Sequence, residues 1–290
     1  MPDIVIHVVA SALYAALALH FWQTRWRVQP ERWRAQPEAS AAAPSGLRTG
    51  LRSWERAAIV LPLALHGVLL YAEMFARPDI RFGFAYALSV MLWLTVLFYW
   101  LESFIYDLDA MQPPALALAA LSVPLPALFP GHVGGAYAAS FAFRLHLVLA
   151  MLAYSLFTIA ILHAVLMAVA ERRLHLKAGG AGVGLGALPP LLTLERLLFR
   201  LIGAAFVLLT LTLATGFGFS ETLFGRAMRF DHKTVFGILS WFTFGGLLAG
   251  RWLHGWRGRT ALRWTLSGFV LLILAYIGSR FVLEVLLGRG

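Results

Sequence analysis

Eight long apolar stretches constrain the fold of this chain more than any other feature of its sequence. They cover approximately residues 4–22, 57–76, 82–101, 114–130, 145–170, 197–217, 234–249 and 265–287. A helix needs about 20 mainly apolar residues to cross a bilayer, where its backbone groups must bond to one another. Only 13% of the 290 residues are charged, whereas soluble domains have about 25%. The sequence therefore excludes a soluble globular protein. It predicts an all-α polytopic membrane protein with about eight transmembrane helices in one domain, residues 1–290.

Two of these stretches are less regular than the others. The fourth contains Pro124 and Pro126, and we expect a kink there because each proline removes a backbone donor. The seventh is short and contains Gly237, Gly245 and Gly246. Small residues in a membrane helix allow a neighbouring helix to approach closely.

The basic residues predict the orientation of the chain. With the N-terminus outside, 16 of the 24 Lys and Arg residues fall in inner loops, so the positive-inside rule predicts that both termini are outside. The long inner loops are residues 23–54, a basic and aromatic interfacial segment with a flexible tether, and residues 171–192, which are Gly-rich. The net charge of +10 is then explained by topology and by contact with lipid headgroups, and no nucleic acid is expected as a partner.

The N-terminal apolar stretch is expected to remain in the mature protein. It is preceded by Asp3 and by no Lys or Arg, whereas a signal peptide begins with a positively charged region. We therefore interpret it as the first membrane helix.

Histidine is the main candidate for a metal or cofactor ligand. The chain has no cysteine, which excludes disulfides and thiolate ligands. His146 begins the fifth stretch and His232 the seventh, both near the predicted outer face. Two axial imidazoles are a common way to hold haem iron. The alternative is that both are interfacial polar residues that reach the headgroups, and spacing alone leaves both interpretations open.

Further polar residues lie inside or at the ends of the stretches. His66 and Glu73 are seven residues apart on one face of the second stretch. Ionisable groups in a membrane usually line a cavity or pair with one another, so these two are candidates for a buried site or an ion path. The alternative is a hydrogen-bonded histidine and an interfacial carboxylate.

Asp231 or Thr234 is predicted to cap the seventh helix, beside Lys233 as a counter-charge.

Three blocks of sequence resemble a known family. The first is RLHLVLAMLAYS, residues 144–155, in which Tyr154 follows His146 by eight positions. The second is LERLLFRLIGAAFVLLTLTLATG, residues 194–216, and the third runs from Phe224 through FDHKTVFGILSW to Leu283. In these blocks the chain resembles the cytochrome c assembly family of CcsA-type, haem-handling membrane proteins, and more closely its shorter HemX-like and YpjD-like relatives.

The chain also departs from the pattern of that family. The external Trp-rich motif of the family ends in Trp-Asp-Pro-Lys, whereas this chain reads FGRAMRFDHK, with Asp231 and Lys233 retained and His232 in place of proline. Residues 286–288 stand where a second external histidine is expected, and an inner-side histidine would fall near Ala249. These departures argue against a complete cytochrome c synthase.

The resemblance implies an inner-membrane protein that handles haem in cytochrome c biogenesis, without enzymatic activity and together with other assembly proteins. It implies a haem b site at the outer face between the fifth and seventh stretches, in the external segment 218–233. His146 is the expected first axial ligand of the haem iron, and His232, which replaces the proline of the family, is expected from its position alone as a substitute second ligand. The other expected cofactor-binding residues are Arg229, Phe224, Phe230, Asp231, Lys233, Trp241 and His66.

Two interpretations from other classes remain open. One is a transporter or transport accessory for a small ion, such as a divalent metal, that uses His66 and Glu73. The other is a membrane scaffold in which all histidines are structural. The scaffold predicts neither a bound cofactor nor a transport phenotype from single histidine changes.

Overall fold

Helices make up most of the chain. The computed structural model describes residues 2–26, 51–74, 81–106, 111–133, 140–176, 191–224 and 231–288. The helices are α1 (Pro2–Phe21), α3 (Ser53–Met74), α4 (Phe84–Glu102), α5 (Gln112–Ser122), α6 (Leu125–Leu128), α7 (Phe141–Leu176), α8 (Leu191–Phe224), α9 (His232–His254), α10 (Gly258–Ile273) and α11 (Ser279–Phe281). A π-helical segment η1 (Trp22–Trp26) follows α1, and two more, η5 (Leu274–Gly278) and η6 (Val282–Leu286), continue the last helix on either side of α11.

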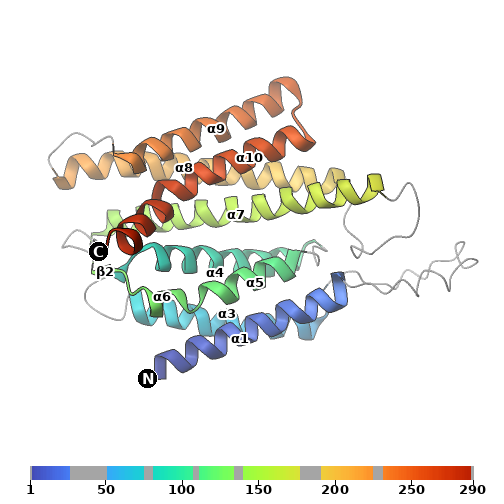
Figure 1. Ribbon diagram of the computed structural model, residues 1–290. Helices are drawn as coiled ribbons and strands as arrows, with labels where there is room; N and C mark the ends of the chain where they lie inside the picture. Colours follow the sequence, from blue (N-terminus) through green and yellow to red (C-terminus); the bar gives the residue numbers. More distant parts are fainter. Residues whose placement is uncertain are drawn as a thin grey trace, which may run out of the picture.

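Seven helices in the described ranges are long and apolar enough to cross a membrane, which confirms an all-α polytopic membrane protein. The fourth predicted stretch differs, because α5 ends at Ser122 and α6 begins at Leu125. Pro124 and Pro126 lie at this break, so the predicted kink is confirmed. Figure 1 shows that α5 and α6 nevertheless run back alongside α4, antiparallel to it.

Some helices extend beyond their predicted bounds. Helix α8 continues past residue 217 to Phe224, and α9 continues past Ala249 to His254. Helix α9 stops at Gly255, whose φ of 66° is a left-handed conformation that glycine adopts readily. Residues 225–230, with Arg229 and Phe230, lie outside the described residues, as do 27–50 and 177–190 of the two predicted inner loops.

The helices pack around two main apolar cores, which meet at α4. Helices α1, α3 and α5 enclose one core with part of α4, and α7 to α10 enclose the other with the rest of α4. In the second core Phe157 of α7 stacks on Phe244 of α9, with ring centroids 3.8 Å apart. Gly268 of α10 gives room to this pair, since a Cβ there would lie 2.8 Å from the Phe244 ring. The stacked rings therefore connect α7 to α9 within the core. In Figure 1 the helices α8 and α10 lie between these two helices.

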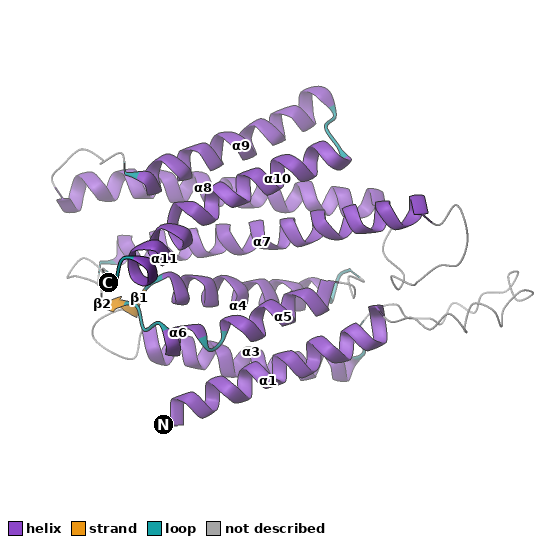
Figure 2. Ribbon diagram, in the orientation of Figure 1, coloured by secondary structure: helices purple, strands orange, loops and turns teal. Residues whose placement is uncertain are grey.

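Both ends of the chain lie at the same end of the bundle, which we call the terminal end (Figure 1). A short antiparallel pair of strands, β1 (Arg81–Phe82) and β2 (His132–Val133), lies there as well (Figure 2). Phe82 is the register partner of His132.

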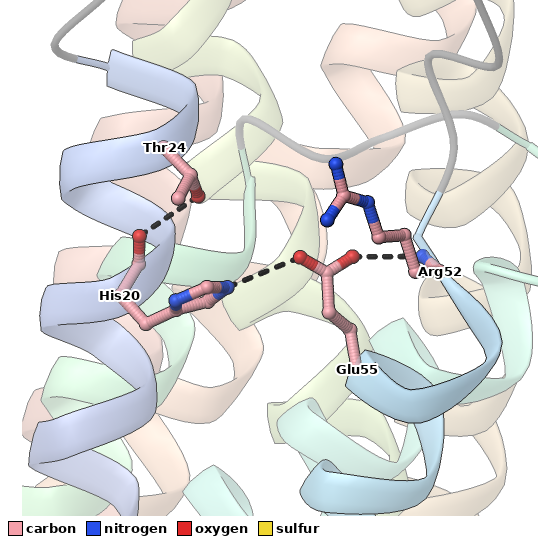
Figure 3. Close-up of polar contacts among 4 residues, drawn as sticks. All are labelled: His20, Thr24, Arg52 and Glu55. Atoms are coloured by element: carbon pink, nitrogen blue, oxygen red, sulfur yellow. Dashed lines mark hydrogen bonds and ion pairs between the residues drawn. The ribbon is translucent and has the colours of Figure 1, made fainter.

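At the opposite end, which we call the far end, a buried carboxylate joins α1 to α3. The Oε1 atom of Glu55 lies 3.1 Å from Nε2 of His20, and its Oε2 accepts a hydrogen bond of 2.7 Å from the backbone N–H of Arg52 (Figure 3). The bond to Arg52 is half of a capping box, in which a third-position Glu satisfies the N–H just before its own helix. The same carboxylate thus caps α3 and fixes the end of α1.

Candidate functional site

His146 is held near the start of α7 by a threonine of α8. Its Nδ1 lies 3.0 Å from Oγ1 of Thr215, and a Cβ at Gly216 would lie 3.3 Å from its Cε1. The Thr215 hydroxyl donates to backbone carbonyls of its own helix, at 2.8 Å from Leu211 and 3.0 Å from Thr212. A ring that donates from Nδ1 to this hydroxyl presents the lone pair of Nε2, which is the tautomer of a metal-ligating histidine with a supporting hydrogen bond.

His146 and His232 lie at the same level of the bundle. The Phe157–Phe244 stack is a common reference point, and His146 precedes Phe157 by 11 residues while His232 precedes Phe244 by 12. At 1.5 Å per residue these offsets are about 17 Å and about 18 Å, and both helices begin at the terminal end (Figure 1). These offsets put the two histidines at similar positions along α7 and α9.

The two histidines lie on different faces of their helices relative to the centre of the bundle. At about 100° per residue, His146 lies within about 20° of Phe157 around α7, toward the centre of the bundle. His232 is rotated about 120° from Phe244 around α9 and is exposed. Lys233, one residue later, lies within about 20° of Phe244 and is half-buried. At the start of α9, Lys233 therefore lies on the same face of the helix as Phe244, whereas His232 does not.

Charged residues surround Tyr276 near the terminal end. The Lys233 Nζ and the Arg280 guanidinium each lie 5.9 Å from the centre of the Tyr276 ring. Asp231 caps α9, because its carboxylate accepts a hydrogen bond of 3.0 Å from the Thr234 N–H, which confirms the predicted cap. Lys233 and Arg280 form a cationic pair between α9 and the last helix. The sequence had identified only Lys233.

The structure places Trp241 between helices. Its Nε1 donates a hydrogen bond of 2.8 Å to Oγ1 of Thr210, and its ring stacks on Phe206 of α8 with centroids 5.4 Å apart. Trp241 is nine residues beyond His232, about 13 Å deeper along the helix, so it mainly fixes α9 to α8. Arg229 and Phe230 lie outside the described residues, and Phe224 ends α8.

Sequence reasoning missed a second cluster at the terminal end. Glu284, near the C-terminus, lies 3.3 Å from Nε2 of His132 in β2 and accepts a hydrogen bond of 3.4 Å from the Phe84 N–H at the start of α4. Gly83 makes this approach possible, since a Cβ there would lie 2.9 Å from a Glu284 oxygen. Phe84 and Glu284 are 200 positions apart in the sequence, so no local pattern links them.

His66 and Glu73 are not paired with each other. The Nε2 atom of His66 lies 2.8 Å from Oγ of Ser89 in α4, while Oε1 of Glu73 lies 3.2 Å from Nε2 of His7 in α1. Both belong to the N-terminal group of helices rather than to the cluster around Tyr276. In the described part of the chain, no three His, Asp or Glu side chains are arranged to hold a metal ion.

Comparisons with known proteins identify the family of the chain. Residues 54–287 match the family model described as cytochrome C assembly protein. The chain is 32% identical over 176 residues to "Inner membrane protein YpjD" of Escherichia coli K12, which covers 61% of this chain and 65% of that protein. It is 37% identical over 144 residues to an uncharacterized 28.8 kDa protein of Azospirillum brasilense, covering 50% and 52%.

A third relative carries a functional name. The chain is 32% identical over 98 residues to "Cytochrome c biogenesis protein CcsA" of Gloeobacter violaceus, which is 34% of this chain and 29% of that protein. No solved structure matches. The curated relatives are thus matched over two thirds of their length or less, whereas the family model covers most of this chain. The chain belongs to the cytochrome C assembly protein family.

Proposed function

We propose that this protein is an inner-membrane, haem-handling protein of cytochrome c biogenesis, which binds haem b at the terminal end of the bundle. His146 is the first axial ligand in this proposal and His232 the second. We place the terminal end at the outer face of the membrane. The chain has no cysteine, so the thiols of a cytochrome c would come from a partner, and we assign no attachment chemistry to this chain.

The contact between His146 and Thr215 is the observation that carries the proposal. Oγ1 of Thr215 lies 3.0 Å from Nδ1 and orients the ring, and in the proposed haem site Nδ1 donates to this hydroxyl while Nε2 binds the iron. His232 lies at the same level but is exposed and turned sideways, so it fits the second position less directly. Family membership and the names of the relatives support a role in cytochrome c biogenesis and a location in the bacterial inner membrane.

Each residue has a separate role in this proposal. Bound haem b would supply an iron with two axial positions for imidazole nitrogens. Thr215 orients His146, and Asp231 fixes the first turn of α9 and with it the backbone of His232. Lys233 and Arg280 supply positive charge for the propionate carboxylates, a charge-assisted contact.

An absorption spectrum tests the proposal. The purified full-length protein, expressed with ample haem precursor, is expected to show a Soret band, and His146→Ala is expected to remove most of it. His232→Ala is expected to shift the band, because one axial ligand changes. His254→Ala is the matched control, since His254 is also an exposed histidine but lies at the other end of α9.

Two results would contradict the proposal. One is a colourless protein under these conditions. The other is a Soret band that is unchanged in the His146→Ala, His232→Ala double variant.

A further inference from the structure

Helices α1 and α3 form a ladder of polar contacts in the N-terminal half. His7 and Tyr14 are seven residues apart on α1, as are His66 and Glu73 on α3, so each pair lies on one face of its helix. His7 contacts Glu73 at 3.2 Å, and the Tyr14 ring packs edge-on against the His66 ring, with centroids 5.8 Å apart. The two contacts are separated by about 10 Å along the antiparallel helices.

Polar atoms of this ladder lack partners among the described residues. The Tyr14 hydroxyl, Nδ1 of His66 and Oε2 of Glu73 are buried and form no hydrogen bond with the described part of the protein. Tyr14 is 0% exposed and His66 1%. Each buried unsatisfied group costs about 1–3 kcal/mol, and lipid offers no hydrogen bonds. A site with several such groups is polar enough to hold internal water.

The ladder opens at the terminal end. The side chain of Glu73 is 22% exposed, near the terminal end. Beyond Tyr14 and His66, in the direction of the far end, Phe21 and Ile59 are apolar and fully buried. Polar contacts therefore extend from the terminal end to His66, and the buried Ile59 separates them along α3 from the Glu55–His20 contact at the far end.

We propose that this ladder binds internal water and carries protons between the terminal end and His66. The titratable groups that face His66 are Tyr14 and His7 of α1 and Glu73 of its own helix, and its partner on α4 is Ser89. A proton enters at the Glu73–His7 pair, crosses on water, and is taken up at Nδ1 of His66 beside the Tyr14 hydroxyl. Uptake at Nδ1 leaves the Ser89 contact at Nε2 in place.

This proposal does not depend on haem binding, because these residues belong to the N-terminal group of helices and take no part in the proposed haem site. In this proposal the ion that moves along the N-terminal helices is a proton and not a divalent metal ion. In the described ranges His7 and Glu73 are in contact there, and no group of three His, Asp or Glu side chains is placed to hold a metal ion, as a metal site of the usual kind requires.

Hydrogen exchange at the imidazole carbon C2 tests the proposal, because this exchange requires water and a proton at the ring. It can be measured by mass spectrometry on the full-length protein in D2O. His163 is the internal control, being 0% exposed on α7 with its Nδ1 2.9 Å from the Ile159 carbonyl. We expect His66 to exchange at least about tenfold faster than His163, since protection follows access to solvent. Equal rates in the wild-type protein would overturn the proposal, without any variant that has to fold.

Variants test the route. Glu73→Gln removes the proton entry and Tyr14→Phe removes a water partner, so each is expected to slow exchange at His66 several-fold while His163 stays unchanged. Glu73→Asp is expected to restore most of the rate. Unchanged exchange at His66 in both Glu73→Gln and Tyr14→Phe would contradict the route. So would suppression of His66 exchange by added Zn²⁺ alone, which would indicate a metal site.

Discussion

At the scale of single residues, Thr215 determines what His146 can do. Its hydroxyl donates to its own helix and accepts from the His146 ring. Thr215→Val keeps the shape but removes the acceptor, so haem affinity is expected to fall about 10- to 100-fold, as for other groups that orient a metal ligand. Titration of the haem-free protein, followed by absorbance, measures this.

Thr210→Val is the matched control on the same helix, because its hydroxyl accepts from Trp241 rather than from a histidine. We expect this variant to lose some stability and to keep its haem affinity. Equal haem affinities in Thr215→Val and Thr210→Val would show that the Thr215 contact does not support a ligand.

At the scale of elements, glycines determine how closely α9 and its neighbours approach. A Cβ at Gly268 would lie 2.8 Å from the Phe244 ring, which is itself stacked on Phe157. Gly268→Ala is therefore expected to push α10 from α9 and to cost about 1–3 kcal/mol, the usual cost of overpacking. At Gly203 of α8 nothing lies within 4 Å, so Gly203→Ala is expected to stabilise the helix by up to about 1 kcal/mol. Thermal unfolding of both variants in one detergent compares them, and a stabilising Gly268→Ala would refute the packing argument.

At the scale of the whole molecule, the two ends of the bundle differ in charge. Arg52, Arg56, Arg196, Arg200, Arg251, Arg257, Arg259 and Arg263 lie at or near the far end of their helices. The positive-inside rule then predicts that the far end lies in the cytoplasm and both termini outside. Alkaline phosphatase is active only outside the cytoplasm, so a fusion after residue 288 is expected to be active and one within residues 177–190 inactive. The reverse pattern would invert the orientation and move the proposed haem site to the cytoplasmic face.

Features that depend on local physics were predictable from the sequence. The apolar stretches gave the helices because hydrocarbon forces the backbone to bond internally, and Pro124, with no N–H to donate, gave the break between α5 and α6. The cap of Asp231 on α9 and the close approach at Gly246, where a Cβ would lie 3.0 Å from Trp264, also followed from short patterns. His146 and His232 could be placed at one depth because rise per residue is nearly constant.

Only the tertiary structure decided which polar groups meet. Glu73 pairs with His7 instead of His66, and Glu284 joins His132 and the start of α4 from the other end of the chain. Arg280 joins Lys233 at Tyr276 although 47 positions separate them in the sequence. Helical periodicity specifies the face on which a side chain lies, but not the helix that covers this face. That choice depends on the packing of all the helices at once, so the contacts of the candidate site became visible only in the folded bundle.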